Sequence, residues 1–160
     1  MQPLTTDDVR AALNTLLPGT EITLYDDSTA TSQQAADAIG CELGQIVKSL
    51  AFIINGTPIL VLASGDQFVD DRKLAAMFDV GRKKVKTAKP DQCIEYYGYA
   101  PGGVPPVGHR EKLPTYIDDS LGRYETVYAA AGAHNAIFPI PYADLVRITA
   151  GIVADVKKQG

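Results

Sequence analysis

Apolar residues recur along this chain at two spacings, and together these spacings predict a mixture of helices and strands. Val9, Leu13 and Leu16 lie on one stripe of a helix that begins at Thr6 and is ended by Pro18-Gly19. Apolar residues at helical spacing, or residues that commonly cap a helix, predict further helices over residues 31–40, 70–80, 91–97 and 142–149.

The strongest strand signal is a hairpin. Two apolar runs, residues 46–54 and 59–63, flank Asn55-Gly56, a dipeptide typical of the tight turn between antiparallel strands. Shorter strands are expected over residues 21–25, near Val85, and over residues 115–118, 126–130 and 136–140. This order predicts one α/β domain over residues 1–160, with a largely antiparallel or mixed sheet and no regular βαβ array.

Composition limits the classes of protein to which the chain can belong. With 160 residues, of which 46% are hydrophobic, the chain can bury a core of its own. Cys41 and Cys93 are far apart, and His109 and His134 are the only histidines, so neither a disulfide scaffold nor a metal site is expected. The net charge of −4 argues against a protein that coats nucleic acid in general, although it allows a local basic site, and no apolar run could cross a membrane. We therefore expect a cytoplasmic protein.

Common catalytic motifs are missing from the sequence. It contains no GxSxG elbow, no P-loop, no GxGxxG after a strand and no HExxH. Serine-nucleophile, nucleotide-triphosphate and metal-hydrolase functions are therefore disfavoured.

Lys48 is the first candidate for a functional residue. In a strand it shares one face with the apolar Leu50, Phe52 and Ile54. Two interpretations remain open: a lysine at a strand end that extends its ammonium group into solvent, or a cation held in a cleft. In a cleft, a partly desolvated ammonium could bind a phosphate, a carboxylate or a carbonyl oxygen.

A glycine- and proline-rich segment, residues 98–108, is the second candidate. Glycine lets the main chain approach a ligand closely, and proline stiffens a loop. Such a loop could direct amide groups at an ester carbonyl and stabilise the oxyanion that develops there. A tight structural turn uses the same residue types, so the pattern leaves both interpretations open.

Two further segments could contact a ligand. Residues 129–133 are alanine and glycine at the end of a predicted strand, and they could form a pocket wall with room for a ribose and its acyl group. His134 could act as a base, donate a hydrogen bond to a phosphate, or be a loop residue without a chemical role. The basic side chains of residues 82–89 could contact an RNA backbone through their charge, or could protect a strand edge.

The order of these motifs resembles one family, the YbaK / prolyl-tRNA-synthetase-associated editing domains, over almost the whole chain. The similarity lies in residues 31–36, 44–50, 63–66, 69–70 and 73–75. It is most specific in Gly98-Tyr99 and residues 102–108, which are followed by residues 113–115 and 117–118. Tyr128, Gly132 and Asp144-Leu145 complete it.

The resemblance implies an α/β fold with a mixed, strongly bent sheet surrounded by helices. It implies hydrolysis in trans of the ester bond of mischarged aminoacyl-tRNA, such as alanyl or cysteinyl groups on proline tRNA, with no metal or organic cofactor. Lys48 falls on the essential lysine of the family, while Gly102 and Pro106 fall on the ends of its GxxxP loop, which shapes the acyl pocket.

The expected partners are the acceptor end of aminoacyl-tRNA and prolyl-tRNA synthetase, with neither DNA nor a membrane. The other candidates for substrate binding are Gly103, Val104, Pro105, Ala130, Gly132, His134 and Ile137, and those for the tRNA backbone are Arg82, Lys83, Lys84 and Lys86.

One departure from the family pattern concerns the acyl pocket. Cysteine-specific members carry a serine and an acidic residue after the position of Tyr128, where this chain has Ala130 and Ile137. An apolar lining changes which acyl group can be bound, because a buried polar group without a partner is costly. An alanyl group is therefore as compatible as a cysteinyl group. Two other functions stay open: a non-catalytic module that binds tRNA or a synthetase, and a hydrolase of small esters or amides.

Overall fold

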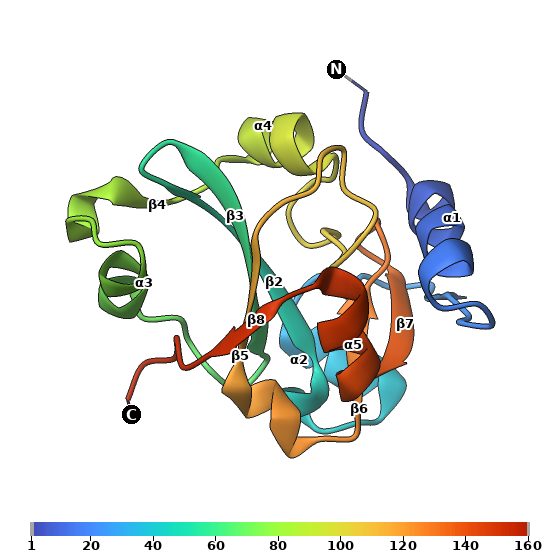
Figure 1. Ribbon diagram of the computed structural model, residues 1–160. Helices are drawn as coiled ribbons and strands as arrows, with labels where there is room; N and C mark the ends of the chain where they lie inside the picture. The colour runs from blue at the N-terminus through green and yellow to red at the C-terminus, as the bar shows by residue number, and fades with distance from the viewer. Residues whose placement is uncertain (1, 160) are drawn as a thin grey trace.

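A long hairpin lies at the centre of the fold, which a computed structural model describes for residues 2–159 (Figure 1). Strands β2 (Val47–Ile54) and β3 (Thr57–Ser64) pair antiparallel along their whole length. Asn55 and Gly56 join them with φ angles of 49° and 83°. Both residues of a type I′ turn need a positive φ, and Asn-Gly supplies it at little cost. The predicted hairpin is confirmed.

Three more strands extend this hairpin to a five-stranded sheet in the order β4-β2-β3-β5-β8. Strand β4 (Val85–Thr87) pairs antiparallel with the end of β2. Strands β5 (Thr115–Asp118) and β8 (Ile152–Ala154) are added parallel to β3 and to each other. The sheet is therefore mixed, as the sequence predicts.

A smaller antiparallel sheet lies beside the first one. Its strands are β1 (Thr23–Leu24), β7 (Ala136–Pro141) and β6 (Thr126–Ala130), in that order. A single parallel bridge between Ile46 and Tyr128 connects the two sheets. The strands thus form two sheets that meet at the start of β2.

Helices cover the two sheets (Figure 1). Thr5 and Thr31 cap the first two helices with their side chains, and Thr31 is the first residue of the range in which the sequence predicts the second helix. Among residues 2–159, no helix is long and apolar enough to cross a membrane. The helices and helical turns are α1 (Thr6–Leu16), α2 (Ser32–Ile39), η1 (Leu43–Gln45), α3 (Asp71–Met77), η2 (Arg82–Lys84), α4 (Pro90–Gln92), η3 (Cys93–Tyr97), η4 (Asp119–Arg123) and α5 (Tyr142–Thr149).

Buried side chains form a large core around the sheets and two smaller ones. Tyr97, Tyr99 and Phe138 are fully buried in the large core. The Tyr97 hydroxyl lies within hydrogen-bonding distance of the main chain of Phe52 and Ile59, and this contact fixes η3 on the central hairpin. The second core lies under α3, and the third packs α2 against the junction of the two sheets.

The sequence-based elements differ from the structure in three places. The expected strand over residues 21–25 is reduced to two exposed residues, Thr23 and Leu24. The expected helix over residues 70–80 ends at Met77, and Asp79 adopts a left-handed φ of 52°. Strand β8 has no sequence signal, because its three residues lie at a sheet edge and show no alternation of buried and exposed positions.

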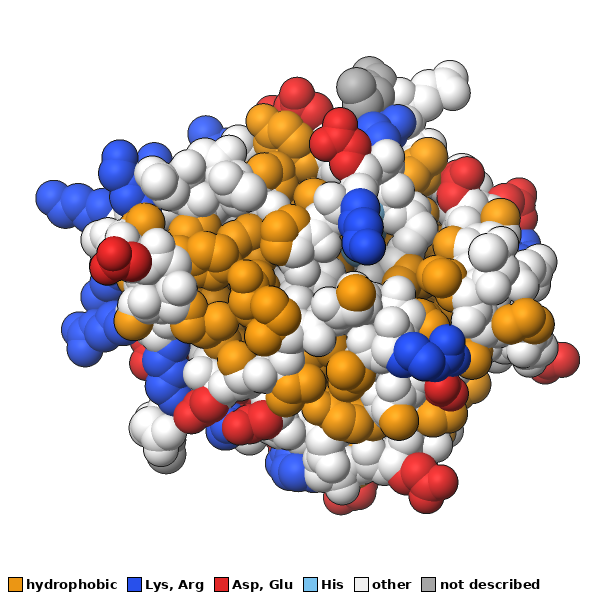
Figure 2. Space-filling view, viewed as in Figure 1, with side chains coloured by type: hydrophobic (Ala, Val, Ile, Leu, Met, Phe, Trp, Pro, Cys, Tyr) orange, Lys and Arg blue, Asp and Glu red, His pale blue; other side chains and the backbone are white. Residues whose placement is uncertain are grey.

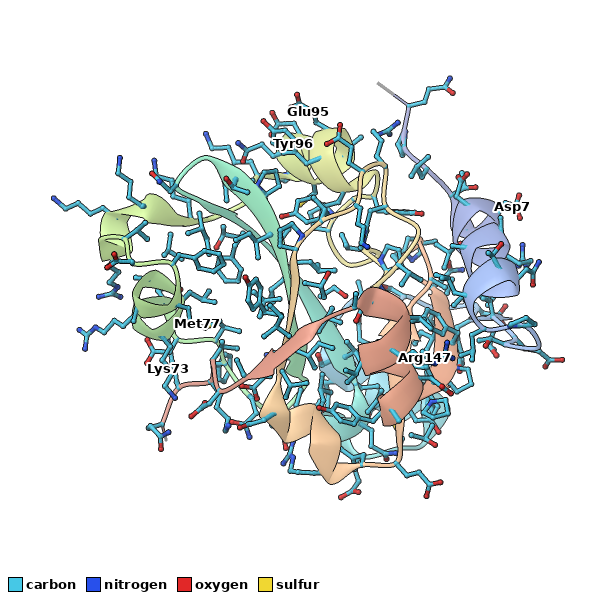
Figure 3. The ribbon with its side chains drawn as sticks, in the orientation of Figure 1. Asp7, Lys73, Met77, Glu95, Tyr96 and Arg147 are labelled. Atoms are coloured by element: carbon cyan, nitrogen blue, oxygen red, sulfur yellow. The ribbon has the colours of Figure 1, made fainter. Side chains whose placement is uncertain are left out.

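Charged groups tie the C-terminal tail to the sheet and to α3. The ammonium of Lys157 bonds with the carboxylates of Asp119 and Asp155 and lies 3.9 Å from that of the buried Asp118. Lys73 extends from α3 (Figure 3). Its ammonium lies 3.0 Å from the Asp155 carboxylate. The three aspartates are close enough together to hold a metal ion, but the lysine ammonium already lies among them. This cluster is therefore a structural ion-pair network.

Candidate functional site

A cavity of about 420 Å³ opens where the edge of β2 faces the smaller sheet. Its walls come from segments that are far apart in sequence: the start of α2, strand β2, the glycine-proline loop, and strands β6 and β7. The lining residues are Thr29, Ala30, Thr31, Ser32, Ala35, Ile46, Val47, Lys48, Ser49, Leu50, Ala51, Thr87, Ala88, Cys93, Pro101, Gly102, Val104, Tyr128, Ala129, Ala130 and Ile137.

The cavity exists because part of β2 lacks a neighbouring strand on one side. Strand β4 pairs only with residues 52–54, and the Ala88 amide bonds with the Ala51 carbonyl. At the other end, Ile46 is bridged to Tyr128. Between these contacts, residues 47–50 have no strand partner on this side within residues 2–159. An open edge presents main-chain donors and acceptors, which a bound ligand can use.

Lys48 lines this cavity, and its ammonium group does not extend freely into solvent. Its Nζ donates a hydrogen bond to the Gln67 carbonyl and lies 4.6 Å from the centre of the Phe68 ring. Burial lowers the pKa of Lys48, while the negative charge of Asp66 opposes this shift. The cation is therefore fixed at the side of the cavity, as the cleft interpretation requires.

Asp66 keeps its charge because of a second cation. The Arg123 guanidinium lies 2.7 Å from its carboxylate, and this contact holds the pKa of Asp66 below its usual value. An ionised Asp66 near Lys48 favours the protonated form of the lysine. The site thus holds a lysine whose charge is stabilised by Asp66 but whose ammonium is partly removed from water.

The glycine-proline loop reaches the cavity with some of its residues. Pro101, Gly102 and Val104 line it. Gly102 has a φ of 89°, and a Cβ atom there would lie 3.0 Å from the Cβ of Ala30. Glycine at this position therefore allows both the loop conformation and its close approach to the start of α2.

The other candidate residues of this loop lie outside the cavity lining. Gly103 accepts a hydrogen bond of 2.9 Å from the Gly132 amide, and a Cβ on Gly103 would lie 3.0 Å from the main chain of Ala133. The Pro105 carbonyl contacts the His109 ring at 2.6 Å. Pro106 lines a separate cavity of about 330 Å³. In the structure, Gly103 holds the loop against the end of the β6–β7 hairpin, and none of these three residues is part of the cavity wall.

The candidates on β6 and β7 are divided in the same way. Ala130 and Ile137 are paired across the two strands, and both line the cavity. His134 is exposed at the end of this hairpin and lies outside the lining. Its main-chain carbonyl accepts hydrogen bonds from the amide and the hydroxyl of Thr29, so it supports the cavity wall through its main chain.

The basic candidates lie on η2 and β4, near the turn of the central hairpin. Arg82, Lys83 and Lys84 form η2, Lys86 lies in β4, and all four are exposed. Figure 2 shows Lys and Arg side chains gathering at the left edge of this face, over α3, η2 and β4. The chain continues from Lys86 directly into Thr87 and Ala88, which line the cavity. The basic stretch therefore adjoins the cavity lining at its Lys86 end.

Ser49 is a residue of interest that the sequence does not reveal. It follows Lys48 on the open part of β2, and its hydroxyl is buried without a hydrogen-bond partner among residues 2–159. A serine inside a strand carries no motif, and its lack of a partner is visible only in three dimensions. Since a buried hydroxyl normally finds a partner, this one carries a cost in stability.

Replacing Ser49 with alanine should stabilise the protein by about 1 kcal/mol, because the change removes a buried polar group that has no partner. For a domain of this size we expect a rise in melting temperature of about 2–4 °C, measured by thermal unfolding. Ser64→Ala is the matched control, because the buried Ser64 hydroxyl bonds with Gly44 and Arg123, and its removal should destabilise the fold. If both variants had melting temperatures equally far below that of the wild type, the Ser49 hydroxyl would have a hydrogen-bond partner and the prediction would be wrong.

The lining offers little conventional catalytic chemistry. Cys93 lines the cavity, but burial raises the pKa of its thiol, which disfavours the nucleophilic thiolate. Among the lining residues that the structure describes, no histidine is present to serve as a base. The arrangement suits a bond that is already reactive and needs mainly positioning, one cation and main-chain donors.

Three comparisons show what this chain is similar to. Residues 26–148 match a family model described as "Aminoacyl-tRNA editing domain". The protein YwhH of Bacillus subtilis (strain 168), described as uncharacterized, is 35% identical over 126 residues, which are 78% of each chain. "Putative Cys-tRNA(Pro)/Cys-tRNA(Cys) deacylase EbsC" of Enterococcus faecalis (strain ATCC 700802 / V583) is 26% identical over 82% of this chain and 80% of that protein. A crystal structure of "a putative trans-editing enzyme for prolyl tRNA synthetase" has a TM-score of 0.90 and 37% identity, covering 96% of this chain and 97% of the other.

Proposed function

The chain belongs to the aminoacyl-tRNA editing domain family, and we propose from this that it hydrolyses the ester bond of mischarged aminoacyl-tRNA in trans. The observation that best supports the proposal is that Lys48, Gly102 and Val104 line one cavity. The solved structure described as "a putative trans-editing enzyme for prolyl tRNA synthetase" supports proline tRNA as the substrate.

The proposed reaction relies on positioning. Lys48 contacts the terminal nucleotide or the acyl group through charge-assisted hydrogen bonds. Main-chain amides of the loop near Gly102 and Val104 polarise the ester carbonyl. A water molecule, guided by a ribose hydroxyl, adds to the carbonyl carbon. The bond between this carbon and the ribose oxygen then breaks, and that oxygen takes up a proton. Lys48 is thus the catalytic residue of the proposal.

The part of the cavity wall that β6 and β7 form favours an acyl group without a large polar side chain. Ala129, Ala130 and Ile137 contribute no polar side-chain atom, and they pair or lie close together on β6 and β7. An apolar wall of this kind accepts alanyl or cysteinyl groups and gives a larger polar side chain no partner. The name of the Enterococcus relative supports the cysteinyl alternative.

The basic stretch should bind the tRNA backbone. Replacing both Lys83 and Lys84 with alanine should weaken tRNA binding and lower the slope of log K against log salt concentration by about 2, since each lysine contributes about one phosphate contact. Filter binding at several salt concentrations measures this slope. The matched control replaces Arg10 and Arg147, which are exposed on α1 and α5. Equal slopes in the two double variants would contradict the role of the basic stretch.

The decisive experiment is a deacylation panel of proline tRNA charged with alanine, cysteine, serine or proline. The proposal predicts hydrolysis of alanyl- or cysteinyl-tRNA well above the spontaneous rate and little hydrolysis of the prolyl ester.

The apolar residues Ala130 and Ile137 favour a second function, a non-catalytic module that binds tRNA or a synthetase. Under that function, charged tRNA would bind and stay charged.

A further inference from the structure

Phe68 is an aromatic side chain in an unusual position. It follows β3, and 71% of its surface is exposed, more than for any other large hydrophobic residue among those described. Its main chain is nevertheless well fixed. The Phe68 carbonyl accepts a hydrogen bond of 2.7 Å from the Lys158 amide, and the next residue, Val69, is bridged to Lys157. The ring is therefore an exposed group on a firm support.

The surroundings of Phe68 indicate what the ring could bind. The Lys48 ammonium lies 4.6 Å from the ring centre, and Lys48 also lines the cavity. A cation that contacts one side of an exposed aromatic ring leaves the rest of the ring available. Single exposed apolar residues are common on protein surfaces, so exposure alone would mean little. Phe68 differs from such residues in three respects: its main chain is fixed, a cation lies next to its ring, and a cavity adjoins it.

A nucleotide matches this combination of groups. Its base offers a flat face that stacks on an aromatic side chain, and every base has such a face. Its ribose and phosphate oxygens are suitable partners for an ammonium group. In an aminoacyl-tRNA, the terminal base and the acyl group are both attached to one ribose. A base on Phe68 would therefore place this ribose near Lys48 and the acyl group at the cavity.

We propose that Phe68 is the stacking platform for the terminal adenine of the tRNA acceptor end. This inference rests on the proposed function and adds a binding residue to it. Phe68 contributes to binding, whereas Lys48 contributes to binding and to the reaction. The two residues are in contact at the side of the cavity. In this proposal Phe68 binds the base of one nucleotide, and Lys48 binds its ribose or phosphate oxygens.

The chain contains no tryptophan, so Phe68→Trp introduces a single fluorescent reporter at the proposed platform. Titration with the trinucleotide CCA should quench its emission in a saturable manner, whereas a trinucleotide that lacks the terminal base should not. Ile152→Trp is the matched control, because Ile152 is 57% exposed on β8, an edge strand that β3 and β5 separate from β2. Its emission should not change with CCA. Equal responses of the two variants, or no response of the Phe68→Trp variant, would overturn the proposal.

Kinetics separate stacking from an indirect effect on Lys48. Phe68→Ala should raise KM for charged tRNA by about 10-fold and change kcat little, because base stacking is a binding contribution. Phe68→Tyr should restore KM. A fall in kcat at constant KM would show that the ring only holds Lys48, and the platform would be rejected.

The fluorescence titration does not need turnover. Quenching without deacylation by the wild type would therefore reject the proposed function alone, and deacylation without quenching would reject the platform alone.

Discussion

Replacing Lys48 with alanine should lower the rate of deacylation at least about 100-fold, because the loss of a contact that positions the ester lets it move out of the reactive geometry. Lys48 is partly buried at the cavity and is fixed there by the Gln67 carbonyl and the Phe68 ring. Its loss removes a charge from a site that has no histidine in its described lining. Single-turnover hydrolysis of mischarged tRNA, with enzyme in excess, measures the effect on the reaction.

The fold should survive this substitution. Lys48 forms no ion pair among residues 2–159, and its partner Gln67 is bonded through the main chain. We expect an unchanged circular dichroism spectrum and a free energy of unfolding within about 1 kcal/mol of the wild type. The exposed Lys112, replaced with alanine, is the control for loss of a lysine elsewhere. Wild-type turnover in the Lys48 variant would contradict the mechanism.

Filling the cavity should be nearly as damaging as removing Lys48. Ala130 lines the cavity from β6 opposite its strand partner Ile137, so a phenylalanine at this position would project its ring into the space proposed for the acyl group. Displacing a reacting group by about 1 Å can cost about 100-fold in rate, and we expect at least about this loss of kcat/KM for every acyl group.

A matched substitution controls for the added aromatic ring. Ala76 is exposed on α3, outside the cavity lining, and Ala76→Phe should leave deacylation unchanged. Because the cavity can accept the new ring of the Ala130 variant, both variants should remain folded, as measured by urea unfolding. If the Ala130 variant hydrolyses alanyl- and cysteinyl-tRNA normally, the acyl group is bound elsewhere.

Local sequence signals predict most of the elements correctly. Thr31 and Gly40 enclose α2, and Asn55-Gly56 places the central hairpin, because a cap and a type I′ turn each depend on a few adjacent residues. Strand β8 could not be predicted, since its exposed Ile152 and Val153 are held by pairing with β5 and not by any pattern of their own. The way the two sheets meet could not be predicted either, because the bridge that connects them joins Ile46 and Tyr128, which are far apart in sequence.

The site, too, could be predicted only in part from the sequence. The sequence identifies the segments that meet there, and the structure brings Lys48, Gly102, Val104, Ala130 and Ile137 to one cavity. Whether a loop residue faces the cavity or the protein interior depends on packing against other segments, which the sequence does not state.

The remaining candidates illustrate this point. Gly103 and Gly132 are bonded to each other, Pro105 contacts His109, and Pro106 faces another cavity. The open edge of β2 likewise results from the short reach of β4, and it cannot be inferred from β2 alone.

The location of the acyl group is the central claim, and a crystal structure with a non-hydrolysable amide analogue of aminoacyl-adenosine tests it most directly. The acyl group should lie in the cavity of about 420 Å³, with its carbonyl oxygen within hydrogen-bonding distance of amides near Gly102 and Val104 and with Lys48 in contact with the nucleotide. An analogue bound in the second cavity, beside Pro106 and away from Lys48, would contradict the account.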